Sequence, residues 1–283
     1  MSRVTEPLII NLAPTGMVPT RSQNPYIPLT PEEIATDVIK CVTKGVSMVH
    51  IHARNKEGMP STDPAIYKEI IGLIRAAVPE VVLVTSTSGR SINQLEHRSS
   101  VLYLEGHFKP DMASLTLGSM NFPTSASINE PKMITQLATI MLAEGIKPEL
   151  EIFDAGMVNF AKILIDKGLL TPPFYFNILL GNPSTAQATL LQLATILSEL
   201  PAQSIWSLGG IGRFQARSNA LGVVMGDGVR VGLEDNLWWD LERTKLATNA
   251  ELVQRIVCQA EALNRTIATP LEARARLGLT KCQ

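Results

Sequence analysis

The sequence predicts one (β/α)8 TIM barrel, an α/β fold in which eight parallel strands close into a cylinder inside a ring of helices. The chain has 283 residues, and such barrels commonly take about 250 residues as one unit. Short apolar runs alternate with longer amphipathic segments along the whole chain. The apolar runs contain few polar residues, as expected for parallel strands covered on both faces.

Each predicted strand is a short β-branched or apolar run, and a helix follows it. The first helix opens at Thr30-Pro31-Glu32-Glu33, with a threonine cap and a proline in the first turn. Gly45 then ends this helix before the second strand begins. The predicted strands are residues 4–12, 46–52, 81–86, 112–117, 149–154, 174–180, 204–208 and 229–232. The helices between the later strands are predicted at residues 64–78, 92–105, 132–144, 158–167, 185–199 and 215–225.

No linker, low-complexity tract or short repeat interrupts this alternation, so residues 1–283 are predicted to form a single barrel domain. The chain from about residue 249 onward is predicted to be a C-terminal helical extension. The fold prediction therefore rests on the repeated pattern rather than on any single boundary, because sequence patterns place boundaries only to within about 2–4 residues.

Composition and cysteine spacing favour a soluble cytoplasmic protein that does not bind nucleic acid. Hydrophobic residues make up 45% of the chain, and 25 basic against 26 acidic residues leave a net charge of -1. No basic stripe is present to bind a nucleic acid backbone. The cysteines Cys41, Cys258 and Cys282 are far apart and form no C-x-x-C pair, which argues against disulfides or a thiolate zinc site. The sequence contains no uncharged apolar run of about 18 residues, so no membrane span is predicted.

Two histidines end the second predicted strand, in the run Val-His-Ile-His at residues 49–52. Residues i and i+2 of a strand point to one face, so His50 and His52 are expected side by side. In this fold the active site lies at the carboxyl ends of the strands. Two imidazoles there would supply half of a tetrahedral zinc site. The alternative is two polar residues that leave the strand and bond to the backbone.

The eighth predicted strand ends in an acidic pair, Glu234-Asp235, four residues after Arg230. In a closed barrel the eighth strand neighbours the first, and the second strand lies on the other side of the first. Glu234 could therefore reach the same metal ion as the histidines, and a His₂Glu set leaves one position open for substrate. Asp235 could then act as a base. The alternative is an acid pair that caps a helix on a solvated loop.

The fifth predicted strand carries two glutamates on one face, Glu149 and Glu151, opposite Leu150 and Ile152. A carboxylate that points into a barrel has to be paired, hydrogen-bonded or protonated, because burying it alone costs several kcal/mol. Glu151 lies nearer the carboxyl end of the strand and is the candidate for chemistry. Glu149 is predicted to have a structural partner.

Three polar turns follow other predicted strands. Residues 13–16 follow the first strand, residues 85–90 follow the third, and the glycine-rich residues 209–213 follow the seventh. The turn at 85–90 offers hydroxyl and backbone donors to an oxyanion, and glycines at 209–213 would let the backbone approach a phosphate or carboxylate. The glycine spacing is not that of a dinucleotide-binding G-x-G-x-x-G motif.

Taken together and in order, these blocks resemble the β-keto acid cleavage enzymes. The most specific parts are H-x-H at residues 50–52 and R-x-G-x-E-D-N at 230–236, and the matches run from Pro7 to Pro270. The blocks that carry the resemblance are residues 15–16, 28–33, 50–54, 86–89, 148–151, 154–157, 210–213 and 230–236. The resemblance implies a zinc-dependent barrel that condenses a β-keto acid with acetyl-CoA and releases acetoacetate and a new acyl-CoA. It also implies a homo-oligomer, with a tetramer as one form.

The resemblance assigns roles by position. His50, His52 and Glu234 would bind Zn²⁺, Asp235 would be the base, and Arg230 would stabilise developing negative charge. Further contacts to the substrate or to the metal-bound group would come from Thr15, Ser86, Ser114, Thr116 and Glu151. A Lewis acid beside the keto oxygen would ease removal of the neighbouring proton, because the charge that develops lies next to the cation.

One departure from the family pattern bears on the substrate. In the members that act in lysine fermentation, a glutamate after the first strand pairs with the amino group of the substrate, and Val18 occupies that position here. A cationic substrate tail would remain unpaired against valine. We therefore expect an uncharged, largely apolar tail. An anionic tail is the alternative, because Arg90 follows the third strand and could reach a second carboxylate.

Two other functions remain open from the sequence. A class II aldolase-like lyase would use the same metal and base without CoA, so its product would form without acetyl-CoA. A metal-binding scaffold or regulatory protein would use no base at all. That function would leave the inward carboxylates Glu151 and Asp235 without a purpose, and costly buried charges usually mark active sites.

Overall fold

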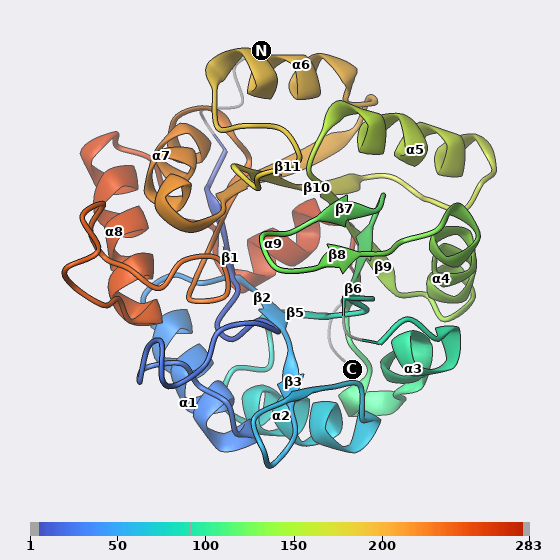
Figure 1. Cartoon of the computed structure of the whole chain (residues 1–283), viewed down its shortest axis with the longest axis horizontal. Helices are drawn as coiled ribbons and strands as arrows, with labels where there is room; N and C mark the ends of the chain where they lie inside the picture. Colours follow the sequence, from blue (N-terminus) through green and yellow to red (C-terminus); the bar gives the residue numbers. More distant parts are fainter. Residues whose placement is uncertain (1–5, 91, 280–283) are drawn as a thin grey trace.

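A computed structural model describes residues 6–90 and 92–279. Eight parallel strands close into a barrel in the order β1-β12-β11-β10-β9-β6-β5-β2, and helices surround it (Figure 1). The predicted (β/α)8 barrel is confirmed. The barrel strands are β1 (Ile9–Leu12), β2 (Met48–Ile51), β5 (Val82–Thr85), β6 (Met112–Thr116), β9 (Lys147–Ile152), β10 (Phe174–Leu180), β11 (Ser204–Gly210) and β12 (Gly228–Val231). Residues 4 and 5 of the predicted first strand lie outside the described residues.

Two of the loops that follow barrel strands contain short hairpins. The sequence patterns did not predict these hairpins. Strands β3 (Ala53–Arg54) and β4 (Pro60–Ser61) pair after β2, and β7 (Met120–Asn121) and β8 (Ala126–Ser127) pair after β6. Strands of two residues are too short to produce a periodic pattern. Both hairpins follow the carboxyl end of a barrel strand, which is the end where this fold places its active site.

The helices that alternate with the barrel strands begin with side-chain caps in most cases. Thr30 and Glu33 form a reciprocal capping box at the start of α1, as the sequence predicted. The helices are α1 (Pro31–Val42), α2 (Pro64–Ala77), α3 (Leu95–Ser99), α4 (Pro131–Ala143), α5 (Ala155–Asp166), α6 (Leu190–Glu199), α7 (Gln215–Met225), α8 (Asn249–Ala262) and α9 (Pro270–Arg276).

Two predicted helices are too long. The segment predicted at 92–105 contains only α3 and a following 3₁₀ turn. Within it, Arg98 is buried and its guanidinium bonds the carbonyl of Thr87 at 2.8 Å, so tertiary contacts decide the local shape. The helix predicted from residue 185 begins instead at Leu190, because Thr189 caps it. The Gln187 side chain bonds backbone carbonyls of the preceding loop.

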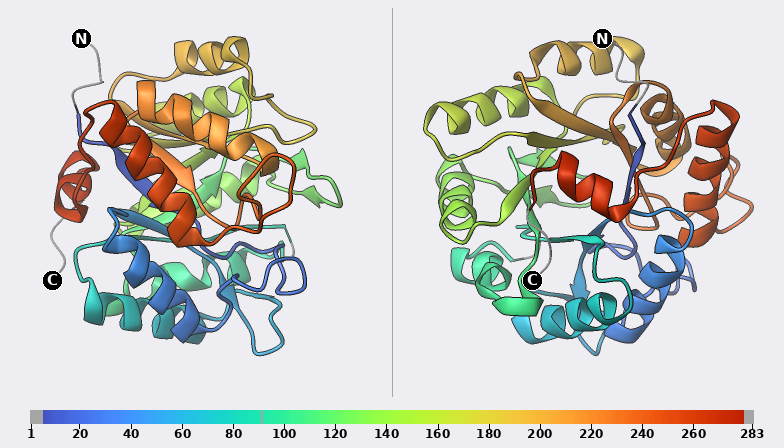
Figure 2. Two further views of the ribbon diagram at one scale, coloured as in Figure 1. Left: turned by 90° about the vertical axis from the view of Figure 1, so that its left-hand side faces the viewer. Right: turned by 180° about the vertical axis from the view of Figure 1, so that it is seen from behind.

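The last two helices lie in different places. Helix α8 contacts α1, α7, β1 and β12, and it occupies the ring between α7 and α1 (Figure 1). Helix α9 lies across the end of the barrel at which the strands begin (Figure 2). There Ala273 and Leu277 pack against Ile9, Met48 and Val82. One end of the barrel is therefore closed by the chain itself, and the carboxyl ends of the strands are at the other end.

No helix in the described residues is both long and apolar enough to cross a membrane. Cys41 is buried and Cys258 is exposed, and both are free thiols. Cys282 lies outside the described residues.

Candidate metal centre and active site

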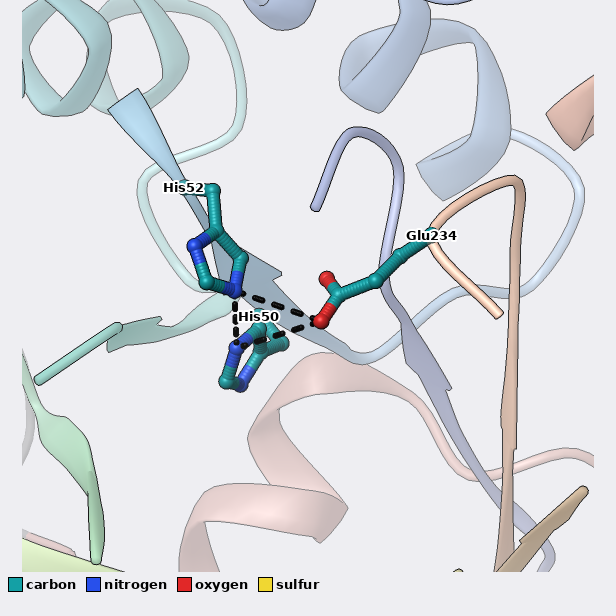
Figure 3. Close-up of side chains that lie close together, drawn as sticks. All are labelled: His50, His52 and Glu234. Atoms are coloured by element: carbon teal, nitrogen blue, oxygen red, sulfur yellow. Dashed lines mark hydrogen bonds and ion pairs between the residues drawn. The ribbon is translucent and has the colours of Figure 1, made fainter. Parts of the chain in front are cut away.

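The two histidines at the carboxyl end of β2 point into the barrel mouth side by side (Figure 3). Their Nε2 atoms are 3.1 Å apart, and both residues are buried. The third member of the group is Glu234, which comes from the loop after β12. Its Oε1 atom lies 3.2 Å from Nε2 of His52 and 4.0 Å from Nε2 of His50. Side chains from the N-terminal and C-terminal parts of the chain therefore bring their ligand atoms within 4.0 Å of one another.

Barrel closure brings Glu234 to this point, because β1 lies between β12 and β2 in the sheet. Two glycines then allow the chain to turn. Gly232 has φ +152°, and a Cβ atom there would lie 2.1 Å from the carbonyl oxygen of Ala13. Gly16 has φ +68°, and a Cβ atom there would lie 2.5 Å from Cγ of Glu234. The backbone of the first loop therefore forms the wall against which Glu234 rests.

The three side chains fit a divalent metal ion. A tetrahedral ion held at about 2.0–2.1 Å separates its ligand atoms by roughly 3.3 Å. The separations of 3.1 Å between the histidines and 3.2 Å between His52 and Glu234 are close to this value, and that of 4.0 Å between His50 and Glu234 is wider. The Oε2 atom of Glu234 is buried and has no hydrogen-bond partner among the described residues. Two imidazoles and a carboxylate form the donor set of catalytic zinc sites, which leaves a position for substrate.

A second group, His50 with Glu149 and Glu151, also has its ligand atoms close together. Its oxygens are already engaged by donors. Oε1 of Glu149 accepts bonds from the amides of Asn11 and Asn177, and Glu151 accepts bonds from Thr116 and Arg230. Every carboxylate oxygen of this group has a donor, because Oε2 of Glu149 also accepts a bond from His50, whereas Oε2 of Glu234 has no partner among the described residues, so the group with Glu234 is the better metal site.

Arg230, on β12, links the carboxylates around the mouth. Its Nη1 atom lies 3.1 Å from Oε1 of Glu151, Nη2 lies 2.7 Å from Oε1 of Glu234, and Nε lies 2.9 Å from Oδ2 of Asp235. Burial alone would lower the pKa of Arg230, but the charges of Asp235, Glu234 and Glu151 hold that pKa well above its usual value. Arg230 is therefore a fixed cation that orients three acids.

The pKa values of the two acids in the loop after β12, Asp235 and Glu234, are shifted in opposite directions. Burial raises the pKa of Asp235, which the charge of Arg230 opposes only in part. Burial also acts to raise the pKa of Glu234, but the charges of His52 and Arg230 outweigh it and hold that pKa well below its usual value. Asp235 is thus the more basic of the two and suits proton transfer, and Glu234 is the anionic ligand.

These groups lie in a cavity of about 250 Å³ at the barrel mouth. One part of its wall is apolar and comes from Met17, Val18, Met120, Phe122, Pro123, Phe153, Leu179 and Ile211. The polar part consists of His50, His52, Ser86, Ser88, Arg90, Thr116, Ser127, Glu151, Arg230, Glu234 and Asp235. The structure therefore brings most of the predicted site residues to one cavity.

Two predicted substrate contacts, Thr15 and Ser114, do not line this cavity in the described part of the chain. Both are buried, and their hydroxyls bond to the protein itself. Thr15 Oγ1 donates to the carbonyl of Pro28 at 3.0 Å, and Ser114 Oγ accepts from the backbone amide of Thr87 at 3.1 Å. In this structure both residues support the loops that carry the site.

The sequence analysis missed two contributors. The β7–β8 hairpin brings Met120, Phe122 and Ser127 to the cavity, and no periodic signal marked it. Arg54 is buried and bonds the backbone carbonyls of Gly16, Pro19 and Gly58, so it holds the loop that carries Val18. Arg54 lies two residues after His52, and this spacing could have indicated that its side chain lies on the same face as the histidines.

The contact between Gly16 and Glu234 leads to a prediction. Gly16→Ala should lower metal affinity about tenfold or more, because the new methyl group displaces the carboxylate, and the left-handed backbone adds a strain of about 1–2 kcal/mol. Gly145→Ala is the matched control, since Gly145 has φ +65° and no atom within 4 Å of the added Cβ. Zn²⁺ titration of both variants checks this. Equal metal affinity in Gly16→Ala and Gly145→Ala would contradict it.

A TIM barrel whose mouth gathers a His₂Glu set, an acid of raised pKa and an arginine defines a barrel enzyme with a candidate metal centre. A sequence profile of the beta-keto acid cleavage enzyme family matches residues 7–279, so the chain belongs to this family.

Similar proteins agree with that assignment. The chain is 36% identical over 278 residues to the 3-keto-5-aminohexanoate cleavage enzyme of Fusobacterium nucleatum, covering 98% of this chain and 99% of that enzyme. It is 34% identical over 279 residues to the 3-oxoadipate:acetyl-CoA acetyltransferase of Cupriavidus necator, covering 98% and 96%. The fold is similar to the ternary complex of ObcA with a C4-CoA adduct and oxalate, with a TM-score of 0.79 and 20% identity over 90% of this chain and 68% of that one.

Proposed function

We propose that this protein condenses a β-keto acid with acetyl-CoA and releases acetoacetate and a new acyl-CoA. The observation that carries the proposal is the placement of Asp235 and Arg230 beside the group of His50, His52 and Glu234, in one cavity at the barrel mouth. Membership of the β-keto acid cleavage enzyme family and the names of the similar enzymes support the same reaction.

His50, His52 and Glu234 would hold the metal ion, which we propose is Zn²⁺. When bound, the ion would supply Lewis-acid polarisation of the keto oxygen. Asp235 would take a proton from the carbon between the keto and carboxylate groups, and the resulting carbanion would attack the thioester carbonyl of acetyl-CoA. CoA would then leave the former acetyl carbon and bond to the former keto carbon. Cleavage of the bond between the keto carbon and the deprotonated carbon would give the new acyl-CoA and the acetoacetate carbanion, to which Asp235 would return the proton.

In these steps Arg230 would stabilise developing negative charge, and Ser86 would position the substrate. Arg230 keeps Asp235 oriented at 2.9 Å and remains charged, so it would stabilise the negative oxygen that develops as each carbonyl is attacked. Ser86 lines the cavity directly after β5, and its hydroxyl would position the substrate. Glu151, held by Thr116 and Arg230, would lie beside the bound substrate.

We propose that the substrate tail is uncharged, short and largely apolar. Val18, Met120, Phe122 and Leu179 line the cavity with hydrocarbon, and Val18 is 47% exposed where a tail would pass. A tail amine would meet no carboxylate at Val18, and leaving a desolvated charge unpaired costs several kcal/mol.

An anionic tail is the second candidate, and Arg90 is the observation that favours it. The Arg90 guanidinium lies 4.0 Å from the centre of the Phe122 ring and lines the cavity. No carboxylate among the described residues pairs with it. One similar enzyme is named for 3-oxoadipate, a β-keto acid whose tail ends in a carboxylate.

A substrate panel tests both the reaction and the tail. We expect kcat/KM to be highest for 3-oxohexanoate, lower for 3-oxoadipate and lowest for 3-keto-5-aminohexanoate, with the acyl-CoA product detected by mass. Product formed without acetyl-CoA would indicate the aldolase-like lyase instead. A preference for 3-oxoadipate that is lost in Arg90→Met would assign the anionic tail.

Val18→Glu should shift the ranking toward 3-keto-5-aminohexanoate by about tenfold or more in relative kcat/KM, because a carboxylate would then face the amino group. Val18→Gln is the matched control, since glutamine has the same shape without the charge. An unchanged ranking in Val18→Glu would mean that another residue recognises the tail.

A further inference from the structure

We infer that Glu149 is a positioning residue for the metal centre: from inside the barrel it holds His50 with Nε2 aimed at His52 and Glu234, and thereby sets the metal affinity. The inference rests on the proposed metal centre. It assigns a function to a glutamate that lies below the cavity and does not line it.

The first support is the contact between Glu149 and His50. The Nδ1–H of His50 donates to Oε2 of Glu149 at 2.6 Å, and the other ring nitrogen lies 3.1 Å from Nε2 of His52. The Glu149 side chain is fully buried and that of His50 is 1% exposed, so water does not compete for this bond. A proton kept on Nδ1 leaves the lone pair of Nε2 directed at the metal site.

The second support is that Glu149 is itself held from several sides. Its Oε1 atom accepts a bond of 2.7 Å from Asn11 and a bond of 3.1 Å from Asn177. Asn177 lies on β10, next to β9, whereas Asn11 lies on β1, which is diametrically opposite β9 in the strand order of the barrel. Both oxygens of the Glu149 carboxylate are therefore held by donors on different strands. Because the carboxylate cannot turn, its bond to Nδ1 also fixes the orientation of the His50 ring.

A carboxylate that accepts the second N–H of a metal-binding histidine fixes the ring orientation and makes the imidazole a stronger ligand. Loss of such a partner typically lowers metal affinity 10–100-fold. The alternative is that Glu149 only fills a polar layer of the core. Tyr175 belongs to the same layer and distinguishes the two, because its hydroxyl bonds Asn11 and Ser207 without touching the histidines.

The test measures the affinity of the metal-free protein for Zn²⁺ alone, by competition with a chromophoric chelator. Glu149→Gln should bind Zn²⁺ about 10–100-fold more weakly than the parent. Tyr175→Phe, which removes a buried hydroxyl from the same layer, should bind Zn²⁺ within about twofold of the parent. Circular dichroism and thermal melting establish that each variant is folded.

Equal Zn²⁺ affinity in Glu149→Gln and the parent would overturn the inference, and so would an equal loss in Tyr175→Phe, because that would indicate general loosening of the core. If Glu149→Gln does not fold, Glu149→Asp replaces it. Aspartate keeps the charge but withdraws it from His50 by one methylene, so its affinity should also fall, and an unchanged affinity would overturn the inference. This measurement needs no substrate, whereas failure of the proposed function would appear as a zinc-loaded parent that forms no acyl-CoA.

Discussion

Asp235→Asn is expected to retain the metal and to lower kcat by about 10²–10⁴-fold. Asparagine has the shape of aspartate and can still accept a bond from Arg230, whose Nε lies 2.9 Å from the carboxylate. It cannot take up a proton from the substrate. Metal content by elemental analysis and steady-state kinetics on the same preparation measure the two effects separately.

Asp63→Asn is a suitable control for this substitution. Asp63 caps α2 by accepting a bond from the amide of Ala65, and asparagine caps helices equally well. This variant should keep both metal and turnover. Retained turnover in Asp235→Asn would transfer the base role to Glu151, which lines the cavity, is held by Arg230 and is not one of the proposed metal ligands.

His52→Ala is expected to abolish stoichiometric metal binding and, with it, turnover. His52 is buried, and the contacts of its ring nitrogen Nε2 are to His50 at 3.1 Å and to Glu234 at 3.2 Å, so its removal leaves two of the three ligands. The barrel should remain folded, because the residue lies beyond the end of β2. Elemental analysis of the purified variant gives the metal content.

His97→Ala controls for the loss of any imidazole, since His97 is exposed on α3. It should bind as much metal as the parent. If His52→Ala also contained the same metal as the parent, the assignment of His50, His52 and Glu234 as the ligand set would be wrong.

Much of the fold could be predicted because its signals are local. The apolar runs of β5 and β10 and the capping box at Thr30 and Glu33 each lie within a few residues of chain. The helix predicted at 92–105 was wrong for the opposite reason. Buried Arg98 bonds Thr87 and Asn129, and these distant contacts override the local helical pattern.

The candidate site was predictable where two local rules coincide. His50 and His52 share a strand face because strand side chains alternate, and strand ends meet at the mouth of a barrel. The family resemblance implied that Ser114, near the end of its strand, contacts the substrate, but its buried hydroxyl bonds the backbone of Thr87, 27 residues away. Strand position predicts which end of the barrel a residue occupies, and packing decides whether it reaches the cavity.

By itself the sequence determined the alternation of strands and helices, the side-by-side histidines and the acidic pair after Arg230, because each depends on neighbours a few positions apart. Only the tertiary structure decided which groups meet. The bond between His50 and Glu149 joins residues 99 positions apart, and that between Arg230 and Glu151 joins residues 79 apart. Such contacts exist only after eight strands have closed, since closure, rather than local conformation, brings β2, β9 and β12 around one interior.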